Sequence, residues 1–144
     1  MARGDHIKVR RWGGVYTHHG IDMGDGTVIH LSGEPLRARH ACVCRTDMAL
    51  FLAGGRARVV AYPPGARSAD EVIAAAEAGL ARGGYCLGRN NCEHFATQCK
   101  IGKPVSRQVL RVLWACGAAT GATAVTIAAL MTARYQKKTA SRSS

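Results

Sequence analysis

The chain has 144 residues and a formal net charge of +11, a length that suits one domain with an ordinary core and a further segment. So basic a chain calls for an acidic partner, either nucleic acid or an anionic membrane surface. Aromatic residues make up only 6% and no zinc-finger or RNA-stacking motif occurs, so we expect no nucleic-acid partner. The polar, basic start does not have the pattern of a secretory signal, so we expect the cysteines to be free thiols.

The first elements predicted are strands. Residues 6–11 alternate weakly and are expected to form an edge strand guarded by basic side chains. Residues 15–31 have the pattern of a hairpin, with apolar runs on both sides of Gly24-Asp25-Gly26. The length of its loop decides which histidines meet.

A three-residue loop brings His18 and His30 to one face, whereas a two-residue loop brings His19 there instead. We favour the three-residue loop, because Gly26 suits the left-handed position of a bulged hairpin.

A strand over residues 40–44 would place His40, Cys42 and Cys44 on one face. Zinc would need a fourth ligand in a tetrahedral arrangement that adjacent strand positions rarely supply. We therefore expect plain strand packing and no metal. Farther along, residues 57–62 predict a strand, and a capping box at residues 68–71 predicts a helix that continues to about Arg82.

A cysteine begins the next predicted helix, which ends near Ile101. Asn90 or Asn91 can cap it, and Glu93 can reach back if Asn90 is the cap. The positive end of the helix dipole favours a thiolate at Cys92, although a cysteine in a first turn also packs well. Taken with two histidines on a hairpin face, this predicts a possible catalytic set in which one histidine takes the thiol proton and the other orients it. A structural role for each of these side chains stays open at this point.

The composition changes toward the C terminus, where residues 112–133 carry no charge. As a helix this segment would be about 33 Å long, enough to span a bilayer core, and basic residues flank both its ends. The alternative is a soluble, alanine-rich helix that packs on the domain or on a partner. Gly117 and Gly121 hint weakly at self-association. We expect a catalytic domain over residues 1–106, a membrane-anchor helix over 107–135 and a basic tail over 136–144.

Over about residues 4–108 the sequence resembles the lecithin:retinol acyltransferase-like family, in its phospholipase A/acyltransferase type. The matching stretches are Gly4-Asp5, His18-His19-Gly20-Ile21, Gly24-Asp25-Gly26, Val28-Ile29-His30, and Tyr85 followed by Asn91-Cys92-Glu93-His94-Phe95. The resemblance implies an α+β fold in which a small antiparallel sheet packs with helices, of the circularly permuted NlpC/papain-like type.

By position, the resemblance places the nucleophile at Cys92, the general base at His18 and the orienting histidine at His30. Tyr85 and Asn91 would support them, and we interpret His94 as structural. The sequence departs from the family at His19, where tryptophan is common, and at Asp22, where an aromatic residue is common. Both departures leave the identity of the substrate open. We expect Asp22 to be a solvated side chain at a strand end.

The implied function is a thiol-dependent acyltransferase or phospholipase A that acts on glycerophospholipid esters through a thioester and needs no cofactor. It would lie at an anionic membrane, held there by its C-terminal segment, with the catalytic domain in the cytosol. The alternatives are a papain-like peptidase or amidase and a non-enzymatic membrane-remodelling or adaptor protein.

Overall fold

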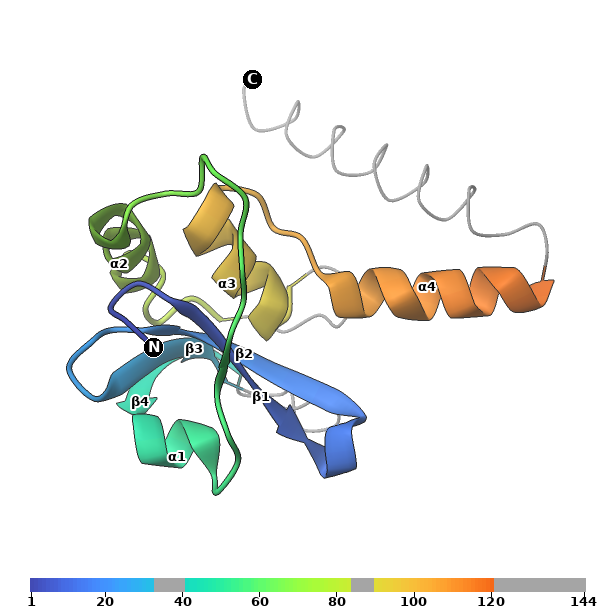
Figure 1. Cartoon of the computed structure of the whole chain (residues 1–144), viewed down its shortest axis with the longest axis horizontal. Helices are drawn as coiled ribbons and strands as arrows, with labels where there is room; N and C mark the ends of the chain where they lie inside the picture. The colour runs from blue at the N-terminus through green and yellow to red at the C-terminus, as the bar shows by residue number, and fades with distance from the viewer. Residues whose placement is uncertain (33–40, 84–89, 121–144) are drawn as a thin grey trace. The chain divides into compact units, whose positions relative to one another are not determined.

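The computed structural model describes residues 1–32, 41–83 and 90–120, the last four of them by their backbone alone. The chain divides into two units, Met1–Ser106 and Arg107–Ser144. Within the described residues, the first unit contains the sheet and three of the helices, and the second contains helix α4 (Figure 1). The boundary predicted at residues 135 and 136 lies outside the described residues.

Within the described residues, five antiparallel strands form one sheet in the order β4-β3-β2-β1-β5. The strands are β1 (His6–Arg11), β2 (Tyr16–Asp22), β3 (Thr27–Leu31), β4 (Val43–Asp47) and β5 (Arg58–Val59). The prediction that β1 is an edge strand is wrong, because β5 pairs with it on the side away from β2. Only two residues of the strand predicted at 57–62 join the sheet, and they are enough to make β1 interior.

The hairpin of β2 and β3 has the register that a three-residue loop requires. Ile21 pairs with Ile29, and the Met23 amide donates to the Thr27 carbonyl at 3.0 Å. Gly26 has a φ of +84°, the left-handed conformation expected of it. The predicted register is therefore confirmed.

Helices cover both faces of the sheet (Figure 1). Helices α2 (Ala69–Glu77) and α3 (Cys92–Ile101) pack on one face, and α1 (Met48–Leu52) packs on the other. The first layer buries Ile21, Ile29 and Leu31 against Val72, Ile73, Ala76, Cys92, Ala96 and Cys99. The second layer buries Phe51 against Ile7, Val9 and Val28. The α+β class with a small antiparallel sheet is confirmed, and the permuted NlpC/papain-like type stays a prediction.

Helix α2 begins where predicted, at the capping box of residues 68–71, but ends earlier. It stops at Glu77 rather than continuing to Arg82. The chain turns at Ala81, which has a φ of +61°, so that the Ala81 amide and the Arg82 carbonyl bond to the backbone of Val43. These sheet-like hydrogen bonds with the start of β4 compete with continuation of the helix.

Helix α4 (Arg107–Thr120) is the described part of the predicted membrane segment. Three of its large apolar side chains are exposed, those of Leu110, Val112 and Trp114. No helix in the described part of the chain is both long enough and apolar enough to cross a membrane. The predicted transmembrane helix is therefore not supported. Its later residues, including Gly121, lie outside the described residues.

Candidate active site

Helix α3 begins at the cysteine because Asn91 caps it. The Asn91 side-chain oxygen accepts from the amides of Glu93 at 2.9 Å and His94 at 3.0 Å. In return, His94 Nδ1 accepts from the Asn91 amide at 3.4 Å. The cap is thus Asn91 rather than Asn90, and His94 rather than Glu93 completes the capping box. The helix ends at Ile101, as predicted.

The two histidines predicted as base and orienting residue are in contact. His18 Nε2 lies 2.9 Å from His30 Nδ1, and the rings meet edge to face at a centroid distance of 4.9 Å. Phe51 packs on both rings from α1. The intervening position is Gly20, where a Cβ atom would lie 2.5 Å from Val28 and 3.2 Å from the His30 Cβ. The absence of a side chain there is what allows the pair to form.

A tyrosine hydroxyl connects this pair to the cysteine. Tyr16 Oη is hydrogen-bonded to Cys92 Sγ at 2.8 Å and lies 3.4 Å from His18 Nδ1. Cys92, Tyr16, His18 and His30 therefore form one connected series, which we call the relay. Tyr16 was not among the site residues predicted from the sequence. Strand alternation was the signal available for it, since Tyr16 precedes His18 by two residues and so lies on the same face.

The far end of the relay is also occupied. His30 Nε2 lies 3.1 Å from Thr46 Oγ1 and 3.8 Å from Cys44 Sγ, both on β4. The protons can be assigned so that every hydrogen bond from Tyr16 to Thr46 has one donor and one acceptor, if each group donates in the direction of β4. In that set, Tyr16 donates to His18 Nδ1, His18 Nε2–H donates to His30 Nδ1, and His30 Nε2–H donates to Thr46. His18 Nδ1 then carries no proton and accepts the hydrogen bond from the Tyr16 hydroxyl.

The thiol reaches Tyr16 at a gap in the sheet. The ladder between β2 and β3 ends at the pair Ile21–Ile29. Beyond it, the side of β2 that faced β3 is open to the start of α3. Cys92 Sγ lies 3.9 Å from the Thr17 carbonyl, and a hydrogen bond from the backbone of His19 lowers the pKa of the thiol. Residues 17 and 19 lie one pleat apart on that same open edge.

Burial controls the charge state of the relay. It raises the pKa of Cys92 to about 11, although the hydrogen bonds from Tyr16 and the backbone of His19 act in the opposite direction. It also lowers the pKa of His18 to about 3, with the charge of His30 as the next cause, and lowers the pKa of His30 to about 4. The helix dipole favours a thiolate at Cys92, but the loss of hydration on burial acts in the opposite direction and is the larger effect on its pKa.

His19 does not belong to the relay. Its Nδ1 lies 2.7 Å from His6 Nε2, and His6 Nδ1 lies 2.7 Å from the Tyr62 hydroxyl. Burial lowers the pKa of His19 to about 4, while the charge of Glu93 acts to raise it. Adjacent strand positions face opposite sides of a sheet, so His18 and His19 point into different layers.

The remaining predicted residues fall in different places. Tyr85 and His40 lie outside the described residues. Asp22 is only 6% exposed, and its carboxylate accepts from the Gly24 amide at 2.9 Å. The expectation of a solvated Asp22 is therefore wrong, because this carboxylate closes the hairpin turn. Glu93 is likewise buried and accepts from the Ser106 hydroxyl at 2.6 Å.

A small α+β domain that joins a cysteine at a helix start to two strand histidines is the architecture to compare with known proteins. Residues 1–105 match the family described as Lecithin retinol acyltransferase. The chain is also 33% identical to a lecithin retinol acyltransferase of Rattus norvegicus, in an alignment 135 positions long that covers 75% of this chain and 58% of that relative. The chain thus spans a little over half the length of that relative. It belongs to the lecithin retinol acyltransferase family.

Proposed function

We propose that this protein is an acyltransferase or phospholipase A that uses Cys92 to take an acyl group from a glycerophospholipid ester. The observation that carries the proposal is the relay, which connects a thiol to a neutral, oriented histidine base. Membership in the lecithin retinol acyltransferase family supports acyl transfer as the class of reaction.

In the first step, Cys92 sulfur attacks the ester carbonyl carbon as its proton passes to Tyr16 and the Tyr16 proton passes to His18 Nδ1. His30 Nδ1 accepts from His18 Nε2 and so stabilises the imidazolium that forms. Because the pKa of Cys92 is high and that of His18 is low, the proton moves during the attack and no ion pair exists beforehand. The amide at the open edge of β2 and the N-terminal amides of α3 would hold the negative charge.

Collapse of the tetrahedral intermediate breaks the bond from the acyl carbon to the glycerol oxygen. The lysophospholipid alkoxide takes a proton from His18 through Tyr16, which leaves a thioester on Cys92 and the relay neutral again. Water, an amine or a hydroxyl then attacks the thioester carbon and gives its proton to His18. The acyl–sulfur bond breaks, and the Cys92 sulfur takes the proton back from His18 through Tyr16. Cys92 is fully buried in the resting structure, so substrate entry requires the start of α3 to become accessible.

The second unit supplies an argument for where the substrate lies. Helix α4 exposes Leu110, Val112 and Trp114 and begins with Arg107 and Arg111 on the same short stretch. Apolar, aromatic and basic side chains together favour an anionic lipid surface. We propose that the segment from Arg107 onward holds the catalytic unit at such a membrane, on its cytosolic side.

The test is to trap the acyl-enzyme. Intact-protein mass spectrometry after incubation with a mixture of phospholipids should find one added acyl mass, sensitive to hydroxylamine and located on Cys92. Cys92→Ala should abolish it. Cys99→Ala removes the other buried cysteine of α3 and is the matched control, which should keep the adduct. Phospholipid turnover by Cys92→Ala would refute the mechanism.

Two further experiments distinguish the alternative functions from this proposal. Acylation from peptide or amide substrates but not from phospholipid would favour a papain-like peptidase or amidase. A cellular effect that survives Cys92→Ala but is lost on deletion of residues 105–144 would favour a membrane-remodelling or adaptor role.

A further inference from the structure

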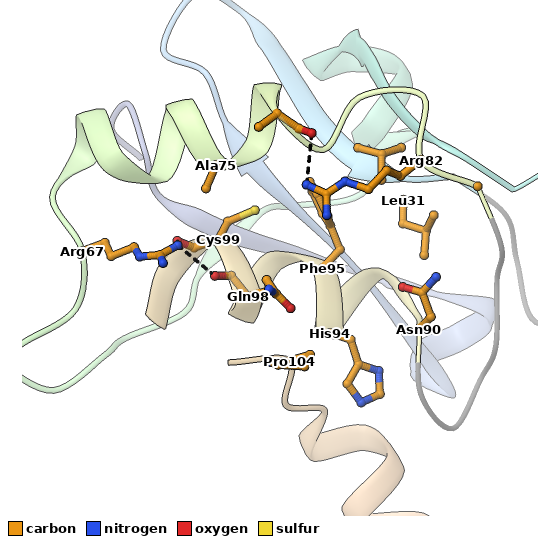
Figure 2. Close-up of a pocket in the computed structure, with 13 residues that line it drawn as sticks. Leu31, Arg67, Ala75, Arg82, Asn90, His94, Phe95, Gln98, Cys99 and Pro104 are labelled. Atoms are coloured by element: carbon orange, nitrogen blue, oxygen red, sulfur yellow. Dashed lines mark hydrogen bonds between the residues drawn. The ribbon is translucent and has the colours of Figure 1, made fainter. Parts of the chain in front are cut away.

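A cavity of about 330 Å³ lies on the face of the sheet that α2 and α3 cover, and residues of both helices line it (Figure 2). Its apolar part consists of Leu31, Val43, Phe95 and Cys99. None of the four relay residues is among the described residues that line it, although Asn90 and His94, at the start of α3, are. Its volume is at the lower end of the range found for small-molecule sites.

Two arginines give the cavity its charge. Arg67 donates to the Gln98 and Cys99 carbonyls at 3.3 and 3.4 Å, and Arg82 donates to the Ala78 carbonyl at 3.0 Å. These bonds fix each side chain at the end of a helix. A guanidinium has five N–H donors, so each arginine keeps donors for a ligand.

The charges of the two guanidinium groups both act on the Cys99 thiol. In the view of Figure 2, Cys99 lies between Arg67 and Arg82. Both arginines lower the pKa of the Cys99 thiol, against the larger effect of burial, which raises it to about 11. The described lining residues include no carboxylate that would neutralise this charge. The cavity therefore pairs an apolar wall with two arginines. Arg67 also lowers the pKa of the Glu71 carboxylate, which lies outside the cavity.

We propose that this cavity binds a single-chain anionic amphiphile, with its carboxylate or phosphate between Arg67 and Arg82 and the start of its hydrocarbon chain against Phe95, Leu31 and Val43. Arginine pairs recognise such oxyanions through charge-assisted hydrogen bonds. The volume has room for a head group and part of one chain rather than for a two-chain lipid. Fatty acids and lysophospholipids share this chemistry. The binding site is independent of Cys92 and does not depend on the proposed reaction.

The experiment is calorimetric titration of the 144-residue chain carrying Cys92→Ala, which removes acylation as a source of heat. The probes are decanoate, decyl phosphate and uncharged decanol, each below the concentration at which it aggregates. The variants are Arg67→Gln, Arg82→Gln and Ala78→Phe, whose ring would occupy the cavity from the exposed end of α2. Arg58→Gln, on the exposed strand β5, is the matched control for loss of one charge.

We expect saturable binding of one equivalent of either anion, and binding of decanol weaker by about tenfold or more. Arg67→Gln and Arg82→Gln should each weaken the anions by about tenfold and leave decanol unchanged, whereas Arg58→Gln should change neither. Preference for decanoate or for decyl phosphate identifies a fatty acid or a phosphate head as the natural source. Equal binding of anions and decanol by the unsubstituted cavity, or no binding, would overturn the proposal, and this comparison needs no arginine variant to fold. Unchanged binding in Ala78→Phe would also overturn it.

Discussion

Tyr16→Phe is the most informative single change, because it removes one oxygen atom and leaves the ring. That oxygen is 2.8 Å from Cys92 Sγ and 3.4 Å from His18 Nδ1, and it is the group that connects the thiol to the proposed base. Its hydrogen bond also lowers the pKa of Cys92, so its loss makes the thiol harder to ionise. Both effects slow the attack.

The expected cost follows from the role of the hydroxyl. A positioned acid or base contributes about 10²- to 10⁴-fold to a rate. Tyr16 transmits the proton rather than holding it, so we expect the lower limit, a fall of about 100-fold in kcat/KM for acylation. This corresponds to about 2.7 kcal/mol of transition-state stabilisation. The buried ring still packs against Trp12, so the free energy of unfolding should change by about 1 kcal/mol or less.

The assay is single-turnover acylation with a phospholipid in mixed micelles, followed by mass spectrometry. Tyr62→Phe is the matched control, because it removes the same atom from a tyrosine that contacts His6 rather than the relay. It should acylate at the rate of the unsubstituted protein. If Tyr16→Phe also acylates within about twofold of that rate, the proton does not pass through Tyr16 and the reasoning is refuted.

Three further predictions concern the thiol, the cap of its helix and the glycine beside the histidines. Because burial raises the pKa of Cys92 to about 11, the thiolate fraction increases about tenfold per pH unit below that value. The rate at which iodoacetamide alkylates Cys92 should therefore rise steadily from pH 7 to 10. A plateau of this rate by pH 8 would contradict the raised pKa. Asn91→Ala removes the acceptor for two amides of α3, and Ser68→Ala removes the cap of α2. Each should lower the free energy of unfolding by about 1 kcal/mol, but only Asn91→Ala should slow acylation. Equal acylation rates in the two variants would show that the Asn91 cap does not position the thiol. Gly20→Ala places a methyl group 2.5 Å from Val28 and should lower the free energy of unfolding, measured with denaturant, by about 1–3 kcal/mol. The control is Gly83→Ala, whose nearest contact would be at 3.7 Å and which should cost about 0.5 kcal/mol or less. Similar values for the two variants would mean that β2 and β3 are not closely packed at Gly20.

Local chemistry was enough to predict the features that neighbouring residues decide. The Gly24-Asp25-Gly26 loop sets the register of the hairpin, and the side chains two apart on a strand follow from that register. The capping box before α2 and the asparagine before Cys92 mark helix starts because their partners lie within three residues. The contact of His18 with His30 could therefore be predicted from the sequence of the hairpin alone.

Contacts between distant segments decided the rest. β1 is interior only because residues 58 and 59 return to pair with it, and α2 is short because Ala81 and Arg82 bond to Val43. Neither pairing has a local signal, since each depends on where the chain passes after a long connection.

The same division holds at the site. The sequence by itself determined which side chains are candidates, namely Cys92, His18 and His30. Only the tertiary structure decided that Tyr16 lies between Cys92 and His18 and that burial raises the pKa of the thiol. The physical reason is that hydration and the distance between side chains depend on how the N terminus of α3 meets the open edge of β2, across 76 residues of sequence.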